Sequence, residues 1–308
     1  MSAVTHVTHF GDAVIERVRA LGHPLCVGLD PHLARIPSVF RRAQMRPDDP
    51  ETAEAVREFL FALLDRIAGR VAVVKPQIAL FEALGWRGIR VLREVVDQAR
   101  AVGLLVLMDA KRSDIGSSAE GYARAYLDEG APLPSDALTV NPYLGMDTLE
   151  PFLDRARGSG KGLFVLVKTS NPGSGDFQDQ MLTGRPLFVR VAERLAPVSE
   201  ALCGPRTGWS ALGAVAGATH PAAAEAVRAA LPKAIILVPG YGAQGGSAMD
   251  AVRVFTAGPA GREGGLVNSS RAVLFPEPAH DADARDWDRI IDEHMERAID
   301  ELSDAVAS

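Results

Sequence analysis

The chain has 308 residues, of which 47% are hydrophobic and 23% charged, and its formal net charge is −6. This balance is typical of a globular protein and excludes a chain built to coat nucleic acid, because neutralising phosphates needs a surplus of Lys and Arg. No apolar run approaches the roughly 20 residues of a membrane span, and the first residues lack the basic patch and apolar core of a signal peptide. Cys26 and Cys203 show neither a disulfide framework nor metal-ligand spacing, so we expect a cytoplasmic protein.

One unit repeats along the chain: a short aliphatic run followed by an amphipathic helical stretch. Most of the runs are continuously apolar rather than alternating, as expected for parallel strands that are buried on both faces. In chain order, the predicted strands are Leu25–Leu29, Val71–Val74, Leu104–Met108, Ala137–Val140, Leu163–Val167, Leu212–Val215, Ile235–Val238 and Leu266–Val267.

Helical patterns lie between and after these strands. They include Glu51–Ile67, Arg87–Val102, Ala119–Asp128 and a final helix from about Asp286 to about Leu302. Ser117 or Ser118 is the predicted N-cap of the third of these helices, because a hydroxyl can accept a hydrogen bond from a free helical N–H. The final helix is expected to pack against the outside of the fold. The segment Thr169–Arg185, rich in Gly, Ser and Asp, follows a strand and is a candidate lid.

Eight strand–helix alternations in about 300 residues predict an α/β fold, a (β/α)8 TIM barrel. We expect a single barrel domain over residues 1–308, with helical extensions at its N- and C-termini. An open, doubly wound sheet has the same alternation and stays open as an alternative. Polar and charged residues follow the carboxyl ends of most predicted strands, rather than gathering at one switch point, and this distribution favours the barrel.

The clearest chemical signal is the spacing Asp-x-Lys-x-x-Asp at the end of the third predicted strand, formed by Asp109, Lys111 and Asp114. Residues two apart on an extended strand point to the same face, so Asp109 and Lys111 should project together into the barrel mouth. A bare Asp-x-Lys pair is more often an ordinary salt bridge at a strand end. The residues around this pair change that balance.

Two further charged residues close neighbouring strands. Lys75 ends the second predicted strand, and by itself it would be a solvated strand end. Asp30 follows the first strand, where an Asx-turn with Pro31 is an equally good explanation. In the same ring as Asp109 and Lys111, these residues suggest an alternating network of ammonium and carboxylate groups.

A glycine-rich segment, Pro239–Gly246, follows the seventh predicted strand, where barrels often bind phosphate on backbone amides. Its Gln244 can donate a hydrogen bond from the side-chain amide. Arg271 follows the eighth strand and offers a guanidinium that can hold phosphate through two hydrogen bonds. A glycine-rich loop alone indicates only flexibility. The loop and Arg271 together indicate a phosphate site.

These motifs resemble those of the orotidine 5′-phosphate decarboxylase family, and Ala119–Ala123 looks like its bacterial subgroup with longer chains. The resemblance extends in order over most of the chain. It is carried by Val27–Pro31, Lys75–Gln77, Asp109–Ile115, Val140–Tyr143, Lys168–Gly173, Pro239–Gly246 and Arg271.

The resemblance implies a catalytic role for one end of the site. Lys111 would be the proton donor in a decarboxylation that uses no cofactor and no metal, and Lys75, Asp109 and Asp114 would complete the charged network. It also implies a homodimer with shared active sites, in which Asp114 reaches the neighbour's site across a two-fold axis.

The remaining implied contacts bind a nucleotide substrate. Asp30 and Lys75 would contact ribose hydroxyls, Ser170 would bond the pyrimidine edge, and Gln244 and Arg271 would hold the phosphate.

Two positions depart from the family pattern. Ser118 stands where the family usually has Thr, and it keeps a hydroxyl for a ribose contact. The stretch Asn268–Ser270 replaces the Gly that commonly precedes the family's Arg, which leaves the backbone part of the phosphate grip unassigned.

Two alternatives to a pyrimidine decarboxylase remain. A sugar-phosphate decarboxylase or synthase of the same barrel superfamily shares the Asp-x-Lys-x-x-Asp spacing but uses a divalent metal. Ser170 and Lys75–Gln77 favour the pyrimidine substrate. A non-catalytic sensor of nucleotide phosphates would explain the glycine-rich loop, but it has no need for two Lys and two Asp in register.

Overall fold

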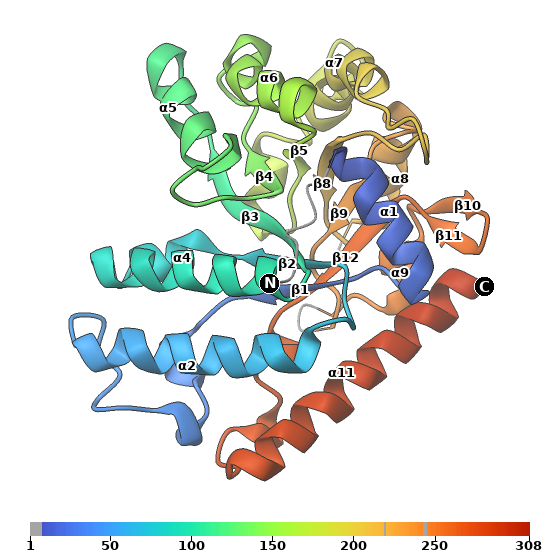
Figure 1. Ribbon diagram of the computed structural model, residues 1–308. Helices are drawn as coiled ribbons and strands as arrows, with labels where there is room; N and C mark the ends of the chain where they lie inside the picture. The colour runs from blue at the N-terminus through green and yellow to red at the C-terminus, as the bar shows by residue number, and fades with distance from the viewer. Residues whose placement is uncertain (1–7, 219, 243–244) are drawn as a thin grey trace.

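Parallel strands close into a barrel at the centre of the computed structural model, which describes residues 8–218, 220–242 and 245–308 (Figure 1). Around the ring the order is β1-β12-β9-β8-β5-β4-β3-β2, and β1 pairs with both β12 and β2, so the sheet has no free edge. The strands are β1 (Leu25–Leu29), β2 (Val73–Pro76), β3 (Leu105–Arg112), β4 (Ala137–Val140), β5 (Gly162–Lys168), β8 (Leu212–Ala216), β9 (Ile236–Val238) and β12 (Gly265–Ser269).

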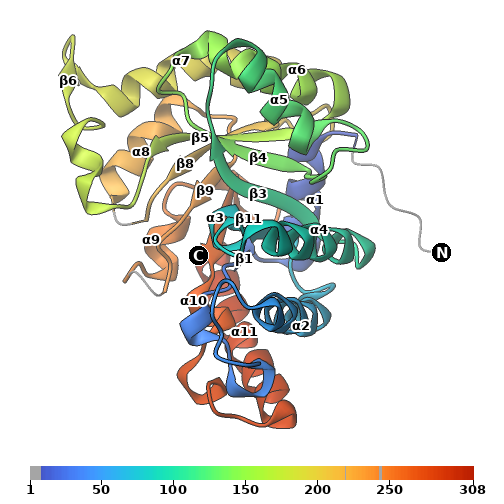
Figure 2. The same cartoon turned by 90° about the vertical axis from the view of Figure 1, so that its left-hand side faces the viewer.

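Helices surround this ring (Figures 1 and 2). They are α1 (Phe10–Leu21), α2 (Pro50–Ile67), α3 (Ile78–Glu82), α4 (Gly85–Ala101), α5 (Gly116–Leu127), α6 (Glu150–Ser159), α7 (Leu187–Ala201), α8 (Pro221–Ala230), α9 (Ala248–Val252), α10 (Arg271–Leu274) and α11 (Ala284–Ala307). Two small hairpins lie outside the barrel: β6 (Met181–Leu182) with β7 (Arg185–Pro186), and β10 (Thr256–Gly258) with β11 (Gly261–Glu263).

The predicted barrel is confirmed, and the open-sheet alternative is wrong because the ring closes between β1 and β12. Each of the eight predicted strands corresponds to one barrel strand, and two of them, β1 and β4, have the predicted bounds. The predicted serine N-cap is wrong. Helix α5 begins at Gly116, so Ser117 and Ser118 lie within its first turn, and Ile115 occupies the N-cap position without a side-chain hydrogen bond.

The apolar residues form two layers. Phe164, Leu105 and Leu266 belong to the cluster that fills the barrel interior, and the larger cluster lies between the strands and the helices. Helix α1 contributes Phe10 to the interior cluster, where its ring meets Phe164 edge-on with centroids 6.0 Å apart. Helix α1 therefore closes the end of the barrel at which the strands begin.

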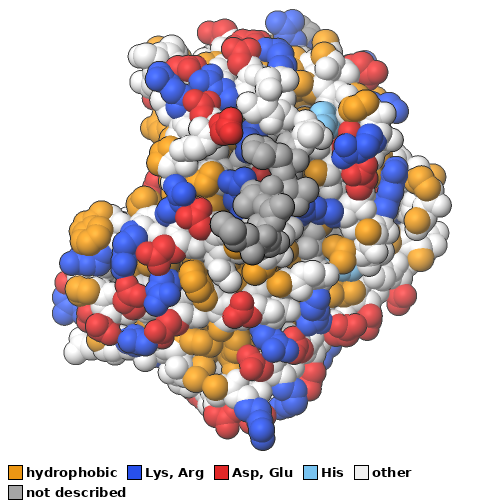
Figure 3. All heavy atoms as spheres, in the orientation of Figure 1, with side chains coloured by type: hydrophobic (Ala, Val, Ile, Leu, Met, Phe, Trp, Pro, Cys, Tyr) orange, Lys and Arg blue, Asp and Glu red, His pale blue; other side chains and the backbone are white. Residues whose placement is uncertain are grey.

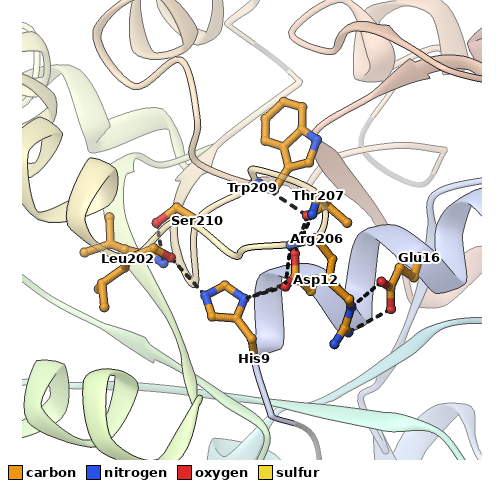
Figure 4. Close-up of polar contacts among 9 residues, drawn as sticks. His9, Asp12, Glu16, Leu202, Arg206, Thr207, Trp209 and Ser210 are labelled. Carbon is orange, nitrogen blue, oxygen red and sulfur yellow. Dashed lines mark hydrogen bonds and ion pairs between the residues drawn. The ribbon is translucent and has the colours of Figure 1, made fainter.

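A buried carboxylate fixes this closing helix (Figure 4). Asp12, fully buried in α1, accepts hydrogen bonds from the backbone N–H and hydroxyl of Thr207 at 2.8 and 2.7 Å and from the N–H of Arg206 at 3.3 Å. Burial by itself raises the pKa of Asp12, but these hydrogen bonds outweigh it and lower the pKa below its ordinary value. His9 caps the same helix by accepting the N–H of Asp12. Because α1 closes this end of the barrel, a functional site is expected at the other end, where the strands finish.

The outer faces of the helices carry both signs of charge. Figure 3 shows basic and acidic side chains interspersed over α2 and α4, and many of them pair, as Arg57 does with Glu54 and Arg93 with Asp97. No helix among the described residues is long and apolar enough to cross a membrane.

Candidate active site

A chain of three charged side chains lies at the carboxyl ends of β2 and β3. The Asp109 carboxylate accepts hydrogen bonds from the Nζ of Lys75 at 2.7 Å and the Nζ of Lys111 at 2.6 Å, one on each oxygen. Gln77 donates a further bond of 3.0 Å to the oxygen that Lys75 holds. The predicted meeting of Asp109 and Lys111 is therefore present, with Lys75 on the other side of the carboxylate.

Burial and charge act in opposite directions on this chain. Burial by itself raises the pKa of Asp109, but the ammonium groups of Lys75 and Lys111 outweigh it and hold that pKa well below its ordinary value. Burial likewise favours a lower pKa for Lys75, but the charges of Asp109 and Asp30 raise it above the ordinary value. The Lys75 side chain is 6% exposed and that of Lys111 47%. Lys75 therefore holds its proton firmly inside, whereas Lys111 lies at the rim.

The backbone at Lys111 departs from a regular strand. Its φ is +49°, in the left-handed region that costs a non-glycine residue about 1–3 kcal/mol, and the pairing register of β3 with β4 shifts between Met108 and Arg112. Thr139 of β4, 1% exposed, holds this turn. Its hydroxyl accepts the N–H of Ala110 at 3.0 Å and that of Lys111 at 2.8 Å, and donates to Asp109 at 3.1 Å. One hydroxyl thus positions both partners of the ion pair.

We expect Thr139→Val to lower kcat by about 10–100-fold with a smaller change in KM, because Lys111 would lose its fixed position. Two buried N–H groups would also lose their acceptor, at a cost of about 1–3 kcal/mol in the free energy of unfolding. Steady-state kinetics and thermal unfolding measure the two effects. Thr139→Ser keeps the hydroxyl and should restore kcat. A Ser variant as slow as the Val variant would show that packing, not the hydroxyl, matters at this position.

A cavity of about 450 Å³ opens beside Asp109 at this end of the barrel. It is lined by Asp30, His32, Arg35, Lys75, Gln77, Asp109, Pro239, Gly240, Tyr241, Asn268, Ser270 and Arg271. One oxygen of Asp30, Oδ1, is buried without a hydrogen-bond partner among the described residues. Leaving such an acceptor unpaired costs free energy, so the geometry favours a ligand that donates a hydrogen bond to it.

The other side of the cavity is formed by the ends of β9 and β12. Gly28 of β1 allows the end of β12 to approach, since a Cβ there would lie 1.9 Å from the Oγ of Ser270. Asn268 and Ser270, which depart from the family pattern in sequence, both line the cavity and hydrogen-bond to each other at 3.2 Å. The segment after β9 is held by Tyr241, whose hydroxyl donates to Glu301 of α11 at 2.6 Å. Helix α11 therefore also supports the site, beyond the exterior packing expected of it.

Comparison with known proteins identifies the family. The model of the orotidine 5′-phosphate decarboxylase / HUMPS family matches residues 23–284. The chain belongs to this family. It is 41% identical to the orotidine 5′-phosphate decarboxylase of Rhodopirellula baltica, over 92% of this chain and 94% of that one, and 44% identical to that of Deinococcus radiodurans, over 86% and 89%. A crystal structure from Streptomyces avermitilis, provisionally given the same name, is 36% identical with a TM-score of 0.81, covering 100% and 99% of the two chains.

The structure brings together Asp30, Lys75, Asp109 and Arg271 around one cavity, with Lys111 bonded to Asp109. Other predicted residues of the decarboxylase-family site lie elsewhere. They are Asp114, whose Oδ1 accepts the N–H of Ile115 at 2.8 Å; Ser118, which is exposed on α5; and Ser170, half-buried beyond the end of β5. The predicted phosphate contact from Gln244 lies outside the described residues.

Ser170 lies close to the end of β8. A Cβ on Gly217 would lie 3.0 Å from the Ser170 Cβ, closer than most side-chain contacts, so glycine at 217 favours this approach. The segment that follows Ser170 folds back on itself, with Asp179 accepting from Lys168 at 2.7 Å and Gln178 accepting from the N–H of Thr169 at 2.9 Å. The candidate lid is thus anchored to the end of β5.

Gln77, Thr139 and Arg35 also lie at the site, although the sequence predicted no role for them. Gln77 ends the Lys75–Gln77 motif, and its position two residues after Lys75 is the signal that could have indicated its role. Thr139 is a single polar residue inside an apolar strand, a pattern that indicates a buried hydrogen bond. Arg35 lies beyond the strand ends in a turn, where sequence gives no indication of direction.

Proposed function

We propose that this protein decarboxylates orotidine 5′-monophosphate to uridine 5′-monophosphate, a step of pyrimidine synthesis, without a cofactor or metal. The observation that carries the proposal is the series of ion pairs Lys75–Asp109–Lys111, which lies beside a cavity that Arg271 lines at its far side. The family supports this proposal, because its curated relatives are named for the activity.

The chemistry leaves an electron pair on the ring carbon that carried the carboxylate. Lys111 would stabilise that charge as an ammonium ion while carbon dioxide departs, and then transfer a proton from Nζ to the same carbon. Asp109 directs Lys111 by accepting one of its hydrogen bonds. Because Lys111 is 47% exposed, it can regain a proton from water after product release.

The remaining contacts would bind the nucleotide. The unpaired Oδ1 of Asp30, with Lys75, would accept and donate hydrogen bonds at the ribose hydroxyls, and Ser118 would add a ribose contact after rearrangement. Ser170 would contact the pyrimidine edge, and Gln244 and Arg271 the phosphate. Binding energy from the phosphate would draw the Thr169–Arg185 segment over the site and exclude water.

We also propose a cytoplasmic homodimer with shared active sites. Apolar side chains are exposed on the connections after β3, β4 and β5, among them Ile115 (63%), Tyr143 (78%) and Met181 (65%). An apolar groove of about 570 Å³ lies beside them, lined in part by Met146 and Leu187. A second copy of the chain would cover these surfaces and receive Asp114. Both cysteines are free thiols, which suits a reducing compartment.

An absorbance assay of the purified protein with orotidine 5′-monophosphate, with and without a chelator, tests the function. We expect turnover that the chelator does not change. The metal-dependent sugar-phosphate reaction is disfavoured because both Asp109 oxygens already accept from ammonium groups, which a divalent cation would have to displace. Loss of activity with chelator, or tight nucleotide binding without turnover, would contradict the proposal.

Arg271→Ala should raise KM and also lower kcat, because the phosphate contact would drive closure as well as capture. Loss of a charge-assisted hydrogen bond costs about 2–3 kcal/mol in transition-state stabilisation. The measurement is kcat/KM for orotidine 5′-monophosphate and for the nucleoside without phosphate. An equal loss with both substrates would remove the phosphate role from Arg271.

A further inference from the structure

The cavity carries a second arginine, Arg35, that the reaction above does not use. Arg35 ends the short 3-10 helix Leu33–Arg35, which follows β1, and its side chain lines the same cavity as Ser270 and Arg271. These residues are more than 230 positions apart in sequence. They meet because closure of the barrel pairs β1 with β12.

Arg35 lies toward the Arg271 side of the cavity. It also lines an adjoining cavity of about 540 Å³ with Phe275 and Pro276, which directly follow the helix that Arg271 begins. The His32 ring packs against Phe275 with centroids 6.3 Å apart and ties the segment after β1 to the same place. The guanidinium of Arg35 is therefore next to the predicted phosphate end of the site, which Arg271 marks. The reacting end, marked by Lys111, lies on β3.

The charge of Arg35 is not used within the described part of the chain. Its guanidinium makes no hydrogen bond or ion pair there, and Glu277 and Asp281, which line the adjoining cavity, lie beyond ion-pair distance. Among the described residues, the other Lys and Arg side chains of the active-site cavity are Lys75 and Arg271, and Lys75 is bound to Asp109.

A phosphate monoester carries a charge of about −1.5 to −2 at pH 7, so a site that holds it through one cation leaves about a third to a half of that charge uncompensated. The glycine-rich segment Pro239–Gly246 contains no Lys or Arg and contributes only neutral donors. Arg271 supplies one positive charge. A second guanidinium at the same end of the cavity would supply the second.

We propose that Arg35 is the second cation of the phosphate subsite and selects nucleotides whose 5′ phosphate is a dianion. The proposal rests on the proposed function and adds to it a specificity-determining residue. It differs from a role in closing the loops, since Arg35 belongs to the segment after β1 and lines the cavity in the structure as it stands.

The test compares three ligands whose 5′ groups carry about two, one and no negative charges at pH 7.5. They are uridine 5′-monophosphate, its phosphate methyl ester and uridine. Calorimetry gives Kd for the wild-type protein and for Arg35→Met, which keeps an apolar stem and removes the charge. We expect Arg35→Met to weaken monophosphate binding by at least about tenfold, the methyl ester less, and uridine not at all.

Arg41→Met is the matched control. Arg41 lies six residues further along the same segment, is exposed, and lines neither cavity. It should bind all three ligands as the wild type does. The proposal is overturned if Arg35→Met binds the monophosphate normally, if it loses uridine equally, or if Arg41→Met shows the same loss.

Turnover separates this result from the proposed function. Wild-type protein that decarboxylates orotidine 5′-monophosphate while Arg35→Met shows an unchanged KM would overturn only the role of Arg35. Wild-type protein that neither binds the monophosphate nor turns over the substrate would overturn both.

Discussion

Lys111→Ala should abolish turnover of orotidine 5′-monophosphate while leaving binding of the product nucleotide largely intact. The variant loses both the ammonium charge at the reacting carbon and the transferable proton. General acid catalysis contributes about 10²–10⁴-fold and a preorganised charge about 10²–10³-fold, so we expect a loss of at least about 10⁴-fold in kcat. Absorbance assays at high enzyme concentration measure the residual rate of decarboxylation, and calorimetry measures the binding of the product.

We do not expect the neighbouring Lys75 to replace Lys111 as the proton donor. Lys75 has a raised pKa, is almost fully buried and is bonded to Asp109, so it is a poor proton donor that cannot exchange readily with water. Lys111→Arg separates the two functions of the side chain, because a guanidinium keeps the charge but does not release a proton. We expect it to be inactive as well.

Lys233→Ala is a control for general effects of removing a lysine, since Lys233 is exposed before β9, at the opposite end of the barrel. It should keep wild-type activity. Substantial turnover by Lys111→Ala would refute the assigned mechanism, whatever its effect on binding.

Much of the barrel could be predicted because its strands are buried on both faces. Leu25–Leu29 and Ala137–Val140 are continuous apolar runs that end at polar residues, and their bounds match the structure. Closure of the barrel was harder to predict, because it depends on the pairing of β1 with β12. No local sequence pattern indicates a contact between strands so far apart in the chain.

The end of β3 shows why the site was only partly predictable. Alternation on an extended strand placed Asp109 and Lys111 on one face, and the two side chains do meet. The backbone at Lys111 is not extended, however, and the hydroxyl of Thr139, 28 residues further along, holds its left-handed turn. The short motif therefore indicates which groups react, but the hydrogen bonds that orient them come from Thr139 on the next strand, β4.

The helical start of α5 is a second example. Ser117 and Ser118 fit the composition of an N-cap, but Gly116 adopts a positive φ of 52° and begins the helix one turn earlier. This leaves Ser118 exposed and Asp114 outside the helix, bonded to the N–H of its own neighbour Ile115. Within a single subunit, neither Asp114 nor Ser118 reaches the ion pairs formed by Lys75, Asp109 and Lys111. Assembly with a second chain would give Asp114 a place to act.

Mixing two inactive variants, Lys111→Ala and Asp114→Asn, should restore activity if Asp114 serves its neighbour's site. In a mixed dimer, one site then lacks both residues and the other has Lys111 from one chain and Asp114 from its partner. Random exchange of equal amounts makes half of the dimers mixed, so activity should return to about one quarter of wild type. Steady-state assays before and after subunit exchange measure the recovery.

The same mixture distinguishes a shared site from a private one. If Asp114 serves its own chain, both sites of every mixed dimer keep one lesion and no activity returns.

Tagged subunits must show that exchange has occurred, and the double variant Lys111→Ala/Asp114→Asn mixed with wild type provides the matched control. In that mixture a shared site leaves each mixed dimer with one site lacking Lys111 and the other lacking Asp114, so mixed dimers are inactive and only the wild-type quarter of dimers remains active. A private site would instead leave one intact site in each mixed dimer and half of the wild-type activity. With a shared site, subunit exchange therefore raises activity from none to about one quarter in the first mixture and lowers it from about one half to about one quarter in the second. Proven exchange without recovery in the first mixture would reject the shared site.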